Sequence, residues 1–330
     1  MSHFNHRTSS VWALLALLML AGGCQNNGTA SQAVQTDADE PIANAAPVIP
    51  KNQKHFATPQ EAVDGLTAAL ANNDMTALLS IVGSEYERLI SSGDANLDAE
   101  RRKEFADDMK ERTELQKDGE DRLNMLIGND KWPAPIPLVK DDQGWRFATE
   151  EGADEMINRR IGKNELAVID VCHAYVAAQA EYARKDRDGD DVLEYAQKVR
   201  STPGTKDGLY WPTEEGEPLS PLGLLNTAAQ IAFPDRKEGD PFMGYYFRIL
   251  NAQGDQVPGG RYNYIINGNM IAGFALVAWP AKYGSTGIMT FVINHQDKLY
   301  QKDLGQDTDQ IASKMTEYNP DSTWKEVVEP

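Results

Sequence analysis

The strongest chemical signal in the sequence is an acidic run, DRDGDDVLE, at residues 186–194. Asp186, Asp188 and Asp190 alternate along the chain, so their carboxylates can converge on one cation. Val192 can add its backbone carbonyl and Glu194 a further carboxylate. Hard oxygen ligands at this spacing are typical of loops that bind Ca²⁺. The sequence therefore predicts a calcium site that is structural, because it would fix the exit of the preceding helix.

Two residues of this run depart from the usual calcium loop. Asp191 stands at the sixth position, where Gly normally makes the sharp turn, and Gln197 replaces the bidentate Glu at the twelfth. Asp can adopt a left-handed turn at some cost, and Gln supplies one oxygen. We therefore expect a dissociation constant of about 10⁻⁴–10⁻³ M, and we expect Leu193 to hold the loop against the core. The alternative is a solvated acidic turn without an ion.

Catalytic side chains are sparse by comparison. Cys172 and His173 are neighbours, but adjacent side chains on a helix point about 100° apart, which favours a structural role for both. Burial raises the pKa of such a thiol and keeps it inert. No HExxH or CxxC pattern occurs, so a zinc site is disfavoured. With 50 acidic residues, close carboxylate pairs are inevitable, and a carboxylate-dependent hydrolase acting on an envelope polymer remains the enzymatic alternative.

Aromatic side chains and net charge bear on what the protein binds. Trp211, Trp279 and Tyr283 fall in predicted loops or at strand ends, where they can line a groove for a sugar or peptide, although core packing is the alternative. The formal net charge of −18 disfavours non-specific binding to nucleic acid.

The N-terminal segment predicts the location of the protein. A short start containing Arg7 precedes an apolar run at residues 11–21, which is too short to span a bilayer. The sequence LAGGC then ends at Cys24, and it resembles the lipobox of bacterial lipoproteins. That resemblance implies a signal peptide at residues 1–23 and an acylated Cys24. Because Gln25 is not the Asp of inner-membrane retention, we expect an envelope protein on the outer membrane, facing the periplasm, with no assigned cofactor besides the predicted calcium.

Composition then divides the rest of the chain into a tether and two domains. Residues 24–54 are rich in Asn, Gln, Ala and Pro and show no apolar period, which is typical of a flexible linker. From residue 55 the patterns change to those of an α+β protein. We predict one domain over residues 55–160 and a second over residues 161–330.

The first domain is predicted to place helices before a small antiparallel sheet. Thr58 caps a helix with Pro59 at its first position and Glu61 three residues after the cap. Two further helices follow, at residues 75–83 and 98–115, and then strands at residues 122–128, 135–139 and 144–149. This order resembles the nuclear-transport-factor-2-like fold.

The second domain is predicted to be a long helix packed on an antiparallel sheet. The helix covers residues 164–186, with a polar stripe that includes Asp170 and His173 on one side. Strands are expected at residues 245–250, 261–267, 270–280, 287–294 and 298–304, and a last helix from Asp307 to about Met315. The arrangement resembles the globular heads of type IV pilins and pseudopilins.

An ordered set of motifs indicates a closer resemblance over residues 55–330. It comprises FATPQEAV, LISSGD, WPAPIPLV, GWRF, NRRIGKNELAVI, DRDGDDVLEYAQ, STPGTKDGLYWP, PLGLL, GFALVAWPAKYG, TFVIN and YQKDLG. Together they resemble the bacterial domain-of-unknown-function 2950 family, which implies an envelope protein without an assigned reaction. We therefore expect a non-enzymatic lipoprotein that binds or scaffolds another envelope protein or polymer. The alternatives are the hydrolase described above and a secretion or pilus accessory protein.

Overall fold

The computed structural model describes residues 48–213, 216–225 and 239–328; for residues 224–225 it describes the backbone alone. All of these residues belong to one unit, Ala45–Pro330. The predicted signal peptide, Cys24 and most of the predicted tether lie outside them. Within the described part of the chain, no helix has the length and apolar character that crossing a membrane requires.

The packed chain begins slightly earlier than residue 55. Gln53 is only 7 % exposed, and its side-chain amide donates to the carbonyls of Ile81 at 2.6 Å and Phe147 at 2.7 Å. Because a buried amide needs such partners, these bonds fix the chain before the first helix. The end of the predicted tether therefore moves toward the N-terminus by a few residues.

Helices form the first part of the fold, and their starts follow from local capping. They are α1 (Pro59–Ala71), α2 (Met75–Val82), the 3₁₀ turn Ser84–Tyr86, α3 (Glu87–Ile90) and α4 (Ala95–Glu111). At α1, Thr58 Oγ1 accepts the Glu61 N–H at 3.2 Å, and the Glu61 carboxylate accepts the Ala57 N–H at 3.1 Å. This confirms the predicted cap. Asp74 and Asp94 cap α2 and α4 in the same way.

An antiparallel sheet follows these helices, in the order β1-β2-β4-β5 with β3 beside β2. Its strands are β1 (Thr113–Lys117), β2 (Arg122–Ile127), β3 (Trp132–Pro133), β4 (Leu138–Asp141) and β5 (Gly144–Phe147). Asp141 pairs with Gly144, which confirms the predicted hairpin. The predicted helix over residues 98–115 starts and ends too late: α4 begins at Ala95 and stops at Glu111, because the chain extends at Arg112 and Thr113 pairs with Ile127. That distant pairing overrides the local helical pattern.

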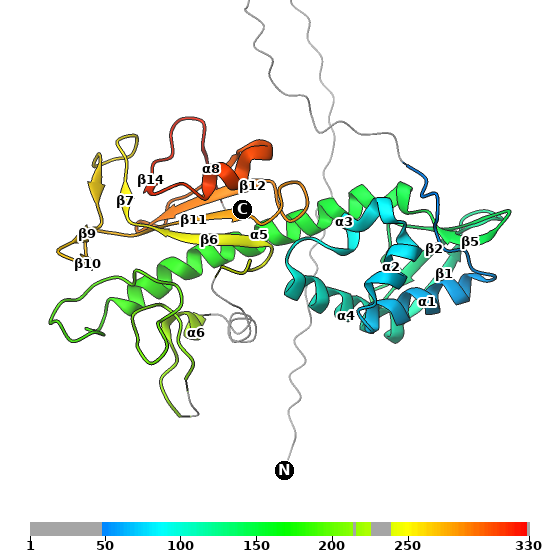
Figure 1. The fold of residues 1–330 in the computed structure, drawn as a ribbon, viewed down its shortest axis with the longest axis horizontal. Coiled ribbons are helices and arrows are strands. Elements are labelled where there is room, and N and C mark those ends of the chain that lie inside the picture. The colour runs from blue at the N-terminus through cyan, green and yellow to red at the C-terminus, as the bar shows by residue number, and fades with distance from the viewer. Residues whose placement is uncertain (1–47, 214–215, 226–238, 329–330) are drawn as a thin grey trace, which may run out of the picture. The chain divides into compact units, whose positions relative to one another are not determined.

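The long helix α5 (Thr149–Tyr182) has 34 residues and passes from the first half of the described fold into the second (Figure 1). It starts 15 residues before the predicted position 164, so the predicted domain boundary at residues 160–161 lies inside a continuous helix. The polar stripe is confirmed, since Asp170 and Arg184 are exposed while Val168, Cys172 and Tyr175 are buried. One helix thus contributes to the cores of both halves of the chain.

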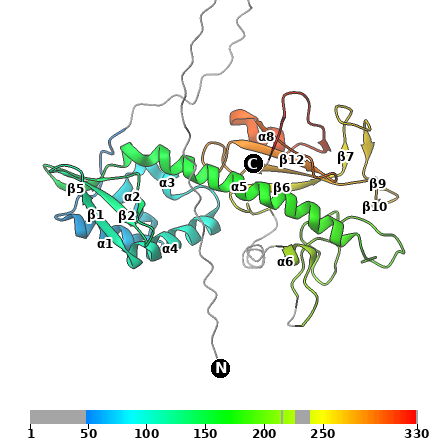
Figure 2. The same ribbon diagram turned by 180° about the vertical axis from the view of Figure 1, so that it is seen from behind.

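A second antiparallel sheet packs on the C-terminal half of α5, in the order β15-β13-β12-β11-β6. Its strands are β6 (Tyr245–Leu250), β11 (Ala275–Pro280), β12 (Met289–Asn294), β13 (Leu299–Asp303) and β15 (Lys325–Glu326). Every residue of β11 is buried. Figures 1 and 2 show why: α5 lies on one side of the sheet and α8 (Thr308–Ala312) on the other. The fold is therefore α+β, as predicted.

Short elements complete the fold and correct two predictions. They are α6 (Pro221–Leu225), β7 (Ala252–Gln253), β8 (Tyr262–Asn263), β9 (Ile265–Ile266), β10 (Asn269–Met270) and β14 (Glu317–Tyr318). Residues 261–267 are not a strand of the main sheet, because β8 pairs with β7 and β9 forms a hairpin with β10. The last helix ends at Ala312 rather than near Met315, and its Asp307 makes no side-chain capping bond.

Candidate functional site

The acidic loop follows the C-terminal end of α5 and is shaped by its own carboxylates. Asp186 accepts the backbone N–H groups of Gly189 at 2.7 Å and Asp191 at 3.0 Å. Asp190 accepts the N–H of Val192 at 2.8 Å. The bond from Gly189 is the main reason why the pKa of Asp186 lies below its usual value. Hydrogen bonds to the charged form therefore favour an ionised Asp186, and they fix the backbone of the loop around it.

Three of the predicted ligands come together. Carboxylate oxygens of Asp186, Asp188 and Asp190 all lie within 4.8 Å of one another, and the three side chains are exposed. Asp191 has φ +64°, so the sixth position adopts the left-handed backbone that the sequence analysis required of it. Three oxygens at this separation can contact one divalent cation, which would offset the repulsion among them. The arrangement is compatible with calcium chemistry.

The other two predicted side-chain ligands point to a neighbouring hairpin. Glu194 accepts the backbone N–H of Met270 at 3.1 Å, and Gln197 donates to the carbonyl of Gly268 at 2.6 Å. Burial raises the pKa of Glu194 above its ordinary value. A third bond joins the two segments, since Asn269 donates to Asp190 at 2.6 Å. The carboxylates of the loop are thus divided between the cluster and the hairpin β9–β10.

Leu193 corrects a further prediction. The side chain is 59 % exposed, so it does not hold the loop against the core. The polar bonds of Asp190, Glu194 and Gln197 to the hairpin perform that task instead.

The basic residue inside the acidic run is withdrawn from the loop surface. The Arg187 guanidinium lies over the rings of Tyr182, at 4.9 Å, and Trp211, at 5.2 Å. It also donates to the carbonyl of Tyr182 at 3.1 Å. Cation–π contacts of this kind stabilise the cation away from the carboxylates. The exposed face of the loop is therefore more acidic than the sequence suggests.

The three aromatic residues predicted to line a groove lie in different surroundings. Trp211 packs near the end of α5, as described above. Trp279 belongs to β11, and its indole N–H donates to Asp309 of α8 at 2.9 Å. The Tyr283 hydroxyl donates to Asp303 at 3.2 Å. Both tryptophans are only 7 % exposed. The burial of both tryptophans agrees with the packing alternative, and a shared ligand groove stays a prediction.

Cys172 and His173 diverge, as expected. Cys172 is buried, and burial raises the pKa of its thiol. His173 points away from it, with Nδ1 at 2.7 Å from the Asp297 carboxylate. A thiol held protonated and a histidine bound to a different residue do not form a nucleophile and base pair.

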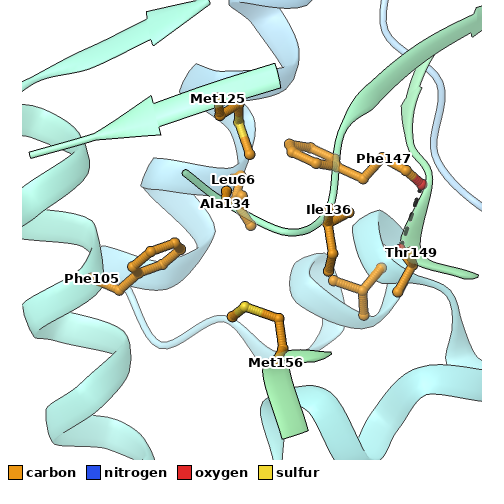
Figure 3. A pocket seen from close by; sticks show the side chains of 9 residues that line it. Leu66, Phe105, Met125, Ala134, Ile136, Phe147, Thr149 and Met156 are labelled. Carbon is orange, nitrogen blue, oxygen red and sulfur yellow. Dashed lines mark hydrogen bonds between the residues drawn. The ribbon is translucent and has the colours of Figure 1, made fainter. Parts of the chain in front are cut away.

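A small pocket lies in the first half of the chain, with a volume of about 50 Å³ (Figure 3). Its walls carry no carboxylate and, apart from Thr149, only apolar side chains. The lining residues are Leu66, Val82, Phe105, Met125, Ala134, Ile136, Phe147, Thr149 and Met156. An apolar pocket of this size lacks the two carboxylates that glycoside hydrolysis requires.

The sequence predicted strands on both sides of the β9–β10 turn, at residues 261–267 and 270–280, but not the contact of this hairpin with the acidic loop. Its turn, Asn267-Gly268, has φ +53° and +98° and is flanked by Ile266 and Asn269. An Asn-Gly pair between two short apolar strands is the strongest local signal for a tight hairpin. That signal was available in the sequence but does not reveal which loop the hairpin contacts.

Comparison with known proteins gives one result. Residues 53–327 match the model of a family described as protein of unknown function (DUF2950). No curated protein and no solved structure matches the chain. The likeness to pilin heads and to nuclear-transport-factor-2-like domains therefore stays a prediction from the sequence.

Proposed function

Since the chain belongs to the DUF2950 family, which carries no assigned reaction, we propose a function from the chain's own residues. The protein is a lipid-anchored, non-enzymatic module of the bacterial cell envelope that binds or scaffolds another envelope protein or polymer. The observation that carries the proposal is the LAGGC sequence ending at Cys24, directly after an apolar run.

The physical argument for the anchor is the free energy of acyl-chain insertion. Each buried CH₂ group contributes about 0.8 kcal/mol, so two or three chains on Cys24 hold a protein on a membrane nearly permanently. The linker that follows has an expected root-mean-square reach of roughly 30 Å. With Gln25 after the cysteine, the anchor belongs in the outer membrane, and the packed unit works in the periplasm beside it.

Fatty-acid labelling in the native cell tests the anchor. The wild-type chain incorporates a labelled fatty acid, and the Cys24→Ser variant does not. Cys172→Ala is the matched control, because Cys172 is the only other cysteine of the chain, and this variant keeps the label. Labelling that survives in Cys24→Ser contradicts the proposed anchor.

A binding role is favoured over hydrolysis by where the polar groups lie. The clustered carboxylates Asp186, Asp188 and Asp190 are exposed at a loop surface, and the pocket in Figure 3 is apolar. Proximity labelling from the anchored protein, followed by identification of its neighbours, identifies the bound component. Recovery of secretin or pilus proteins would instead favour the accessory role in secretion.

A second proposal concerns the acidic loop. We propose that Asp186, Asp188 and Asp190 bind Ca²⁺, supported by the convergence of their oxygens within 4.8 Å. Val192 contributes its backbone carbonyl. The side chains of Glu194 and Gln197 either leave the hairpin to bind the ion or stay on the hairpin and hold the loop in place. The ion would stabilise the end of α5 relative to β9–β10 and would take no part in a reaction.

A further inference from the structure

Three exposed aliphatic side chains gather around the acidic loop. Leu193 is 59 % exposed, Ile266 is 46 % exposed and Ile271 is 43 % exposed. We call these three residues the Leu193 surface. Single exposed aliphatic residues are ordinary, but several on adjoining segments are typical of a binding surface.

Hydrogen bonds place the two segments side by side. Tyr195 pairs with Met270, and its N–H donates to the Met270 carbonyl at 2.8 Å. This pairing brings the segment that contains Leu193 next to the segment that contains Ile271. Figures 1 and 2 both show the hairpin β9–β10 beside the loop that follows α5. The three residues of the Leu193 surface therefore lie on adjoining segments of the chain.

Strand pairing puts one of the three side chains on the face that meets the loop. Ile266 is the direct partner of Asn269 in the hairpin, so both side chains lie on one face. Asn269 is the residue that donates to Asp190. Ile266 thus borders the contact between hairpin and loop, and Ile271 follows directly after the end of β10.

Acidic side chains border this apolar surface. Residues 185–194 contain five acidic and two basic residues, and the guanidinium of Arg187 is turned to Tyr182 and Trp211. Asp188 and Asp191 are exposed within a few residues of Leu193. When the loop holds no cation, a partner that covers the aliphatic side chains must therefore also neutralise several negative charges.

We infer that the Leu193 surface docks a basic amphipathic segment of a partner protein. This inference rests on the binding role proposed above and names the chemistry of the partner. Aliphatic side chains of the segment cover Leu193, Ile266 and Ile271, and its Lys or Arg residues face the acidic border. An anionic lipid surface is repelled by the same carboxylates, and a second copy of a chain with net charge −18 brings like charge to the contact.

Peptide binding tests the inference on the purified full chain, freed of metal with a chelator and kept in one non-ionic detergent for every variant. The probe is a fluorescent 18-residue helical peptide of Leu and Lys with an amphipathic pattern, followed by anisotropy. A peptide with Glu in place of Lys serves as the negative probe. We expect Leu193→Ser/Ile266→Ser to weaken binding about tenfold, because two buried aliphatic anchors of the interface are lost. Asp188→Asn weakens it less, and added salt weakens the wild type.

Ile311→Ser is the matched control, since Ile311 is exposed to the same degree as Ile271, at 43 %, but belongs to α8. This variant binds like the wild type. Equal binding by Leu193→Ser/Ile266→Ser and Ile311→Ser overturns the inference, as does failure of the wild type to bind the Lys peptide. The inference is also overturned if Leu193→Ser/Ile266→Ser abolishes self-association of the protein, or its binding to anionic phosphatidylglycerol vesicles. Either result would assign the surface to another occupant. Fatty-acid labelling of Cys24 is independent of all these outcomes.

Discussion

Calcium binding by the acidic loop predicts a measurable change in stability. The perturbation is the addition of 5 mM CaCl₂ to protein freed of metal with a chelator. Three carboxylates whose oxygens lie within 4.8 Å repel one another, and an ion shared among them removes that repulsion only in the folded chain. Binding to the folded state alone stabilises it by RT ln(1 + [L]/Kd).

The expected magnitude follows from the ligand set. With a dissociation constant of about 5 × 10⁻⁴ M, in the range for weak sites, the folded state gains about 1.4 kcal/mol at 5 mM Ca²⁺. For the unit Ala45–Pro330, that corresponds to a rise in melting temperature of roughly 2–3 °C. Calorimetry or a thermal-shift assay resolves such a rise, with NaCl of equal ionic strength as the reference.

The double variant Asp186→Asn/Asp188→Asn should lose the response to Ca²⁺. The matched control is Glu120→Gln/Asp121→Asn, which removes two exposed acids from the turn between β1 and β2 and should keep the response. A wild-type chain that does not respond to Ca²⁺ refutes the site. An equal rise in the Asp186→Asn/Asp188→Asn variant refutes the assignment of these ligands.

Further predictions concern the fold. Because burial raises the pKa of Cys172, this residue stays a thiol as the pH rises to 9. We therefore expect its alkylation to be slow in the native protein and fast only in denaturant, and fast alkylation of the native protein contradicts this. In Asn164→Leu, Arg101 and the Thr286 carbonyl each lose a 2.7 Å hydrogen bond to the Asn164 side chain. We expect the free energy of unfolding, measured in urea, to fall by about 2–5 kcal/mol. The control Asn129→Leu changes an exposed residue and should lower it by less than about 0.5 kcal/mol. Limited proteolysis cuts first before about residue 50, since Gln53 is buried; an early cut within 60–110 contradicts the fold.

Local signals in the sequence correctly predicted the elements that depend on neighbouring residues. The cap at Thr58 and the turn between Asp141 and Gly144 each involve groups a few residues apart. The polar stripe of α5 depends only on helical spacing, and it fixes which side of the helix is buried. The membership of the family rests on motifs that the sequence itself contains.

Contacts between distant segments decided the parts of the fold and of the candidate site that local patterns did not predict. Thr113 leaves the helical pattern because Ile127 pairs with it, and α5 starts at Thr149 rather than near residue 164. At the candidate site, the sequence determined which carboxylates alternate along the loop and can converge. Only the tertiary structure decided that Glu194 turns to the hairpin and that Leu193 faces solvent. The reason is physical: the backbone N–H of Met270, which lies 76 residues away along the chain, binds the carboxylate, and no pattern within the loop encodes that partner.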